Sequence, residues 1–308
     1  MMNYEIFKET IKNRFVEFLP EEYENSEIII DKVNKVNITM DALIIKPFKT
    51  DNVCPTLYIN EMYEDYKFTK NIEDVLQRAA KVFMDSICKK DFVIDRFKDV
   101  EYIKNNIFFQ FINTKLNKNI LDDVPHREFL DLSIIYRVVI NSNKDKKEIA
   151  STIIHNKLMK VIGLSEEQLF EYASKNTDRL FPSTIKSITS IFGMEDDSPI
   201  DEQMIIISNE LCINGAINMI YEKNLKSIAE KMNSDLYILP SSVHEVIVVS
   251  TKIGDPTYLI RTISEVNSTE LSKTDILSDQ LYMYDKEFNR VISVANNSNI
   301  YKPESLLK

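Results

Sequence analysis

The residues best suited to chemistry in this sequence of 308 residues occur together near its C-terminal third. Ser241, Ser242, His244 and Glu245 bring hydroxyl, imidazole and carboxylate groups into one short segment. Nucleophilic catalysis needs a base within hydrogen-bond reach of the nucleophile and a third group that orients the base. The segment is therefore a candidate catalytic site for a hydrolase that would use Ser242 and His244.

The local geometry expected for this segment limits that hypothesis. If Val243 to Val249 is a strand, Ser242 and His244 share one face of it and Glu245 points to the other, so Glu245 cannot orient the imidazole. The serines also lack the Gly-x-Ser-x-Gly elbow that exposes a hydrolase nucleophile. The alternative is structural: the serines cap a hairpin turn at Pro240 to Ser242, and a neighbouring backbone group satisfies His244.

A second polar group follows the strand expected at Met204 to Ile207. Asn209, Glu210 and Asn214 stand at its end, where loops commonly carry function. Together with Ser241 they are candidate binding residues. Asn side chains also satisfy their own backbone in turns, which gives this corner a structural interpretation as well.

Composition argues against cofactors and metals. The chain has only 4 glycines, too few for a Gly-rich phosphate loop. Its 3 histidines belong to separate predicted elements, whereas a catalytic zinc usually takes ligands at close helical spacing. Cys54, Cys88 and Cys212 form no CxxC pair and are expected to be small buried hydrophobes. We therefore expect no metal site and no cofactor.

The charge of the chain limits its partners. The formal net charge is -10, so nucleic-acid phosphates and anionic membranes are repelled. A basic protein partner is compatible with this charge. The first twenty residues mix charged with apolar side chains and show no apolar signal region. We expect a cytoplasmic protein without a membrane span, and the sequence sets no oligomeric state.

Hydrophobic periodicity predicts the elements that must position these residues. Helices are expected at residues 4–19, 71–88, 149–163, 165–173, 183–192, 215–233 and 256–266, and strands at residues 28–30, 40–45, 56–59, 107–112, 132–140, 204–207, 236–239, 243–249, 281–284 and 291–294. Their mixed order and short connections favour the α+β class, with mixed or antiparallel sheets, packed helices and two α+β halves around one extended core.

The spacing of apolar residues changes from two to 3.6 after the polar run at 141–147. This change predicts an N-terminal α+β half (1–145), a helical connector (146–202) and a C-terminal α+β half (203–308). Residues 60–66 join three carboxylates to two tyrosines. They are predicted to form a solvated loop, with a cation-binding or partner-binding patch as the alternative.

The run from Leu236 to Ile247, and above all its residues 239–245, resembles a family of uncharacterised bacterial proteins classed as a domain of unknown function. Further segments carry the same resemblance, which covers most of the chain: Leu19 to Tyr23, Tyr63 to Tyr66, Asn209, Gly215-Ala216, Glu265 to Asn267 and Leu277 to Asp279. The resemblance implies accessory proteins of anaerobic low-GC Gram-positive bacteria and of their mobile elements. It brings no catalytic residues.

Three functions are compatible with the sequence. The first is a non-enzymatic accessory or regulatory protein that acts through protein contacts. The second is a hydrolase that uses Ser242 and His244. The third is an acidic mimic of nucleic acid, which requires carboxylates gathered on one face.

Overall fold

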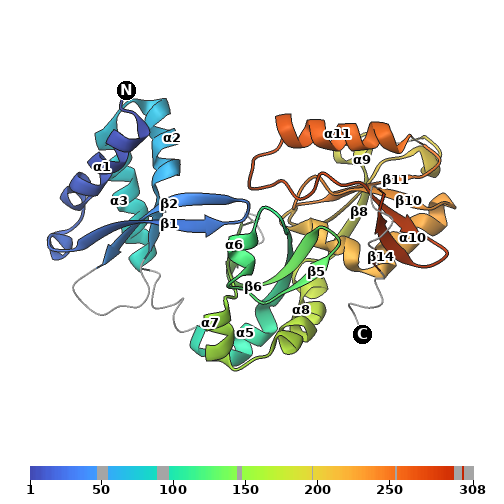
Figure 1. Cartoon of the computed structure of the whole chain (residues 1–308), viewed down its shortest axis with the longest axis horizontal. Helices are drawn as coiled ribbons and strands as arrows, with labels where there is room; N and C mark the ends of the chain where they lie inside the picture. The colour runs from blue at the N-terminus through green and yellow to red at the C-terminus, as the bar shows by residue number, and fades with distance from the viewer. Residues whose placement is uncertain are drawn as a thin grey trace. The chain divides into compact units, whose positions relative to one another are not determined.

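The computed structural model describes residues 1–46, 55–88, 97–143, 148–195, 197–253, 255–294 and 300–301. They belong to two compact units, Met1–Asp99 and Val100–Lys308 (Figure 1). Every strand pair in this part of the chain is antiparallel, and helices pack against the sheets. The predicted α+β class is therefore confirmed.

The N-terminal unit is a small three-stranded sheet covered by helices. Its strands, in the order β1-β2-β3, are β1 (Glu27–Lys35), β2 (Ile38–Lys46) and β3 (Thr56–Tyr58). Its helices are α1 (Tyr4–Arg14), η1 (Phe15–Phe18), η2 (Glu21–Tyr23), α2 (Ile59–Thr69) and α3 (Ile72–Cys88). The first helix, the β1–β2 pair, β3 and α3 match the sequence-based predictions.

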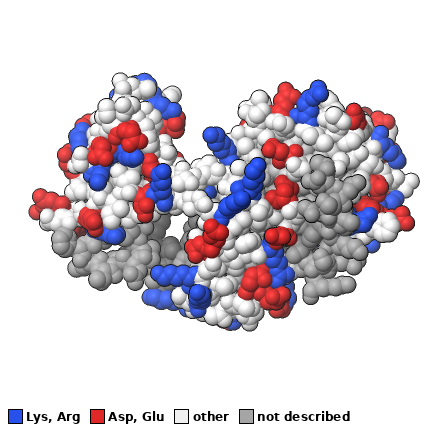
Figure 2. All heavy atoms as spheres, in the orientation of Figure 1, with Lys and Arg blue, Asp and Glu red and all other residues white. Residues whose placement is uncertain are grey.

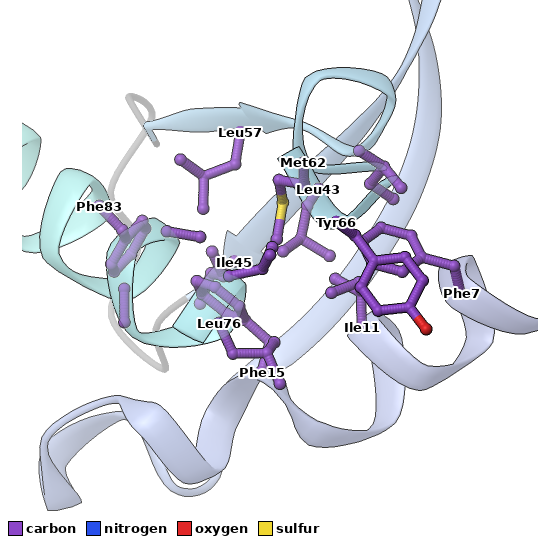
Figure 3. Close-up of a cluster of buried hydrophobic side chains, with 14 of the residues drawn as sticks. Phe7, Ile11, Phe15, Leu43, Ile45, Leu57, Met62, Tyr66, Leu76 and Phe83 are labelled. Atoms are coloured by element: carbon purple, nitrogen blue, oxygen red, sulfur yellow. The ribbon is translucent and has the colours of Figure 1, made fainter. Parts of the chain in front are cut away.

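One apolar core holds this unit together (Figure 3). Rings and aliphatic side chains from α1, α2 and α3 meet the inner face of β2. Phe83 of α3 is fully buried and meets Phe15 and Tyr23 edge to face, with ring centroids 6.4 and 5.6 Å apart. Such ring pairs add to the stability that burial alone gives.

Residues 60–66, predicted as a loop, form most of α2 instead. Ile59, Met62 and Tyr66 recur at helical spacing and enter the core, so an amphipathic pattern too short to recognise alone is stabilised by tertiary packing. The three carboxylates point outward and pair with basic side chains: Glu61 with Lys35, Glu64 with Lys67 and Asp65 with Arg78. The predicted solvated loop is wrong, and these ion pairs occupy the carboxylates of the cation-binding alternative.

The C-terminal unit contains two sheets. The first has the order β4-β6-β5, with β7 also paired to β6. Its strands are β4 (Ile107–Asn113), β5 (His126–Phe129), β6 (Leu132–Asn143) and β7 (Glu148–Ile153), and its helices are α5 (Val100–Asn106), α6 (Lys118–Leu121), α7 (Asn156–Ile162) and α8 (Glu166–Leu180). The predicted capping box of Ser165 and Gln168 starts α8, whose Phe170 packs on Phe109 of β4.

The second sheet has the order β14-β13-β12-β10-β11-β9-β8. Its strands are β8 (Ser183–Ser187), β9 (Ile205–Asn209), β10 (Leu236–Leu239), β11 (Val246–Ser250), β12 (Tyr282–Asp285), β13 (Arg290–Ser293) and β14 (Ile300–Tyr301). Helix α11 (Pro256–Thr269) packs on one face. The other face carries η4 (Gly215–Ile220) and α10 (Glu222–Met232), while α9 (Ile188–Ile191) and η3 (Ile200–Glu202) lie beside β8 and α10.

Two helices predicted around the middle of the chain begin as strands. Residues 148–153 form β7 before α7 starts, and residues 183–187 form β8 before α9. In both places a short helix follows a strand within two residues, so the apolar residues of the two elements resemble one helical stripe in the sequence. The domain boundary predicted at residues 145 and 146 falls between the paired strands β6 and β7, whereas the compact units meet after Asp99.

The stability of the N-terminal unit should depend on Phe83. We expect Phe83→Ala to lower its free energy of unfolding by about 3–5 kcal/mol, because the substitution leaves a cavity among buried rings. Val82→Ala, on the neighbouring and half-exposed position, should change it by less than about 0.5 kcal/mol. Urea unfolding with hydrogen exchange of peptides from α3 measures both, and equal effects would contradict the assigned core.

Candidate functional site

The serine–histidine loop, residues Pro240–Glu245, connects β10 to β11. The structure ends β10 at Leu239 and starts β11 at Val246. Both predicted strands are present, but the predicted start at Val243 and the three-residue turn are wrong. The alternation used to place Ser242, His244 and Glu245 on faces of a strand does not apply here. Their positions follow from loop hydrogen bonds instead.

Ser242 is built into the loop rather than presented by it. Its side chain is buried, and its Oγ accepts a hydrogen bond from the backbone N–H of His244 at 3.0 Å. The backbone of Ser242 forms an antiparallel bridge with Ile276. The hydroxyl therefore stabilises a turn, as the structural interpretation expects.

The imidazole of His244 binds other groups. Its Nδ1 accepts from the backbone N–H of Asn214 at 3.3 Å, and its Nε2 lies 3.5 Å from Oδ1 of Asp275. Among the described residues, no hydrogen bond joins the imidazole to the hydroxyl of Ser242. The acceptor role of Nδ1 places the proton of the neutral ring on Nε2, toward Asp275. The nucleophile and base of a hydrolase are not assembled in this geometry.

The Asn209 corner satisfies its own backbone. Asn209 is buried at the end of β9, where its Oδ1 accepts from the N–H groups of Leu211 and Ile213 at 3.0 and 3.3 Å, and its Nδ2 donates to the carbonyl of Ile213 at 2.8 Å. Glu210 is exposed and donates its backbone N–H to Pro182. The corner is thus a closed turn rather than an open binding site.

Gly215 brings the corner and the loop together. A Cβ at this position would lie 2.4 Å from the carbonyl oxygen of His244, 2.4 Å from Oγ of Ser208 and 2.9 Å from the backbone nitrogen of Asn209. Only a residue without a side chain fits between them. Ser208 Oγ also donates to the same His244 carbonyl at 2.8 Å. The two candidate regions predicted separately are therefore one structural junction.

A polar network that the sequence reasoning missed runs from this junction into the first sheet. Gln110 donates its Nε2 to Oδ1 of Asn214 at 3.0 Å and accepts at Oε1 from Nη1 of Arg137 at 3.2 Å. Arg137 also donates to the side chain and the carbonyl of Ser151. Burial lowers the pKa of Arg137 to about 10, because the interior disfavours a charge without a carboxylate partner. The sequence did contain a signal for this network, because Gln110 and Arg137 are polar residues within strands that are otherwise largely apolar.

The segment at residues 275–279 fastens the other side of the loop. The backbone N–H groups of Leu277 and Ser278 donate to the carbonyls of Ser241 and Pro240 at 2.8 and 3.0 Å. Ser278 Oγ and the hydroxyl of Tyr282 both donate to the carboxylate of Asp131, at 2.7 and 2.5 Å. Burial and this carboxylate raise the pKa of Tyr282 well above its usual value.

Asn267 of α11 completes this fastening. Its Nδ2 donates to the carbonyl of Ser278 at 3.0 Å and to Oδ1 of Asp279 at 2.6 Å. The residues on which the family resemblance rests in this half of the chain thus hold helix, loop and sheets together.

The sequence reasoning also missed an apolar surface beside β8. It predicted a helix over residues 183–192 and exposed chain over residues 195–202. The structure instead exposes a set of large apolar side chains here, which we call the edge surface: Ile185, Ile191, Phe192, Met194, Ile200 and Met204. A cavity of about 370 Å³ opens beside them, and its lining includes Ile185, Ser190, Ile200 and Ile205.

The possible metal ligands in the described part of the chain are dispersed. No cluster of three His, Cys, Asp or Glu residues suited to a metal occurs there. His126 bonds to the carbonyl of Val124 and His155 to the carboxylate of Asp123. Cys212 is exposed rather than buried as predicted, while Cys54 and the side chain of Cys88 lie outside the described residues. No helix in this part has the length and apolar character needed to cross a membrane.

Comparison with known proteins places the chain in a family without an assigned activity. The family model for a family of unknown function, DUF5688, matches residues 4–286. The chain belongs to this family, as its resemblance to a domain of unknown function predicts. No curated protein and no solved structure matches it.

The two serines of the loop provide a matched test of its structural role. Ser242→Ala should lower the free energy of unfolding by about 1–3 kcal/mol, because it removes the acceptor of a loop N–H. Ser241→Ala should change it by less than about 0.5 kcal/mol, since Ser241 contributes its backbone carbonyl to the loop. Urea unfolding compares the two variants, and equal stability of both would refute this role of Ser242.

The close contact at Gly215 can be tested in the same way. Gly215→Ala should destabilise the C-terminal unit by about 1–3 kcal/mol or more, because the clash involves backbone atoms. It should also accelerate hydrogen exchange at Ala216, whose N–H bonds to the carbonyl of Val243. The control is Gly163→Ala, where a Cβ meets no atom within 4 Å but the left-handed φ of +69° adds strain. Unchanged exchange at Ala216 in Gly215→Ala would exclude the assigned contact.

Proposed function

We propose that this protein works by binding another protein, and that the edge surface beside β8 is its contact. The observation that carries the proposal is that six large apolar side chains between residues 185 and 204 are exposed, two of them at the cavity. Contiguous exposed apolar patches on a folded protein mark binding sites more often than isolated apolar residues do. Burial of such surface contributes roughly 25 cal/mol per Å².

The local backbone supports this proposal because it holds the apolar side chains out of the core. After α9, the N–H groups of Gly193 and Met194 bond back to Ser190 and Thr189, at 3.1 and 3.2 Å. Gly193 adopts the left-handed conformation with φ of 71°, which ends the helix. Phe192, 72 % exposed, and Met194, 56 % exposed, flank this turn. A contact held in place before binding loses less entropy when the partner arrives.

Charge bears on the partner in two opposite ways. The net charge of -10 favours a basic partner over long distances. At the edge surface itself, however, the exposed residues Lys186 and Lys231 border the same cavity as Ile185 and Ile200. The net charge of the chain therefore favours the approach of a basic protein, whereas the lysines at the edge surface favour acidic side chains in the final contact.

The two alternatives have less support. The imidazole of His244 and the hydroxyl of Ser242 bind different groups, so the hydrolase lacks its assembled pair. On the face drawn in Figure 2, basic and acidic side chains are interspersed over each unit. A nucleic-acid mimic would need its carboxylates gathered in an array.

We also propose a cytoplasmic accessory or regulatory role in bacteria or their mobile elements. The exposed free thiol of Cys212 supports a reducing compartment, since exposed thiols in oxidising compartments are prone to form disulfides. The family assignment is compatible with this role.

Site-specific photocrosslinking tests the proposed contact. A photoreactive phenylalanine at position 192, in the chain expressed in its native host, should capture one defined protein. The same group at Phe288, 58 % exposed on the turn between β12 and β13, serves as the control and should not capture it. Met194→Ser should weaken the crosslink at position 192. Equal capture at both positions, or none at position 192, would overturn the proposal.

A further inference from the structure

The edge surface includes the free edge of a sheet. Strand β8 is the last strand in the order of the seven-stranded sheet and, within the described part of the chain, pairs only with β9. The N–H of Ile188 donates to the carbonyl of Met204, and the N–H of Glu210 donates to the carbonyl of Pro182. These two bonds extend the β8–β9 register by one residue at each end of β8, and both involve even-numbered residues of the β8 segment. In an antiparallel pair the bonded residues alternate. The N–H and C=O of Ile185 therefore point away from β9, and they have no partner among the described residues.

The two faces of this edge differ in chemistry. Ile185 and Ser187 lie on one face, beside the cavity, whose lining includes Ile200, Ile205 and Ile228 and also Lys186, Gln203 and Lys231. Because side chains alternate along a strand, Lys186 points to the opposite face. Lys186 is exposed and makes no ion pair within the described part of the chain. An added strand would thus meet Ile185 and the largely apolar cavity on one face and Lys186 on the other.

This arrangement selects among possible occupants. A second copy of β8 would place two Lys186 side chains on the same face within two positions of each other, and like charges across strands are destabilising. A strand with a carboxylate on that face would instead form an ion pair with Lys186. Lysine on an edge strand is a usual protection against self-association, and it leaves an acidic strand as the compatible partner.

We infer that the partner of the edge surface adds an extended segment to β8 as an eighth strand, with alternating apolar and acidic side chains. The backbone of Ile185 pairs with the segment, its apolar side chains cover Ile185 and the adjoining cavity, and its carboxylate faces Lys186. Strand addition of this kind obtains affinity from main-chain bonds and specificity from alternate side chains. The inference rests on the proposed function, for which it specifies the binding mode and the chemistry of the partner.

The probe is a display library of ten-residue peptides in which Val, Ile or Leu alternates with Glu, Asp or Thr. Peptides that bind the full chain are selected, and those that also bind the Ile185→Pro variant are removed. The remaining peptides should be enriched in Glu and Asp. Proline at position 185 removes an outward N–H and no bond to β9, which edge strands tolerate. Lys186→Glu should weaken an enriched peptide at least tenfold in fluorescence anisotropy, whereas Lys186→Arg should change its affinity less than threefold.

Two N-methylated forms of the enriched peptide test the strand pairing without altering the protein. One carries methyl groups on the amides of its odd residues, the other on those of its even residues. Only one set can face β8, so one form should lose at least tenfold in affinity and the other should bind within about threefold of the parent. Equal binding of both forms overturns strand addition.

The outcomes separate this inference from the proposed function. No enrichment over Ile185→Pro, with the crosslink at Phe192 intact, overturns the strand addition alone. If the photoreactive group at position 192 captures no protein that the control at position 288 does not also capture, the proposed function is overturned, whether or not peptides bind β8. If the photocrosslink at position 192 captures a second copy of the chain, the inference of an acidic partner segment is also overturned.

Discussion

The C-terminal unit depends on one close approach of backbone, at Gly215. The glycine lets the corner after β9 and the loop before β11 come so near that the carbonyl of His244 accepts from Ser208. Through Asn214 the same junction reaches Gln110 and Arg137 in the four-stranded sheet. Buried polar groups of this kind cost free energy when they lose their hydrogen-bond partners. They therefore fix a single arrangement of the two sheets.

This requirement explains why the most reactive-looking residues are structural. Hydroxyl, imidazole and amide groups can satisfy irregular backbone without regular ladder bonds. The segments around His244 and Ser278 are irregular chain. Their side chains accept hydrogen bonds from backbone N–H groups: Ser242 from His244, His244 from Asn214 and Ser278 from Gln280. The close spacing of Ser242 and His244 in the sequence therefore marks a loop whose backbone requires side-chain hydrogen bonds, rather than a catalytic site.

The sequence predicted elements well where one periodicity was long and undisturbed. Helices α1, α3, α8 and α11 and the hairpin of β1 and β2 carry clear stripes or alternation, and all are present. It failed where tertiary contacts decide: α2 depends on the core that Tyr66 enters, and β8 depends on pairing with β9. Of the candidate site, the structural alternatives for Ser242 and Asn209 could be anticipated. The bonds from Asn214 to His244 and Gln110 join distant segments, so no local pattern could reveal them.

The placement of α9 between two neighbouring strands has an evolutionary consequence. Residues 188–204 connect β8 to β9, which already pair along their full length, so this connection lies outside the sheet ladder. Its length and composition can therefore change with little effect on the strands that hold the unit together. Under the function proposed above, a lineage could exchange one binding specificity for another by altering this connection while retaining the same scaffold, much as variable loops diversify on a constant framework.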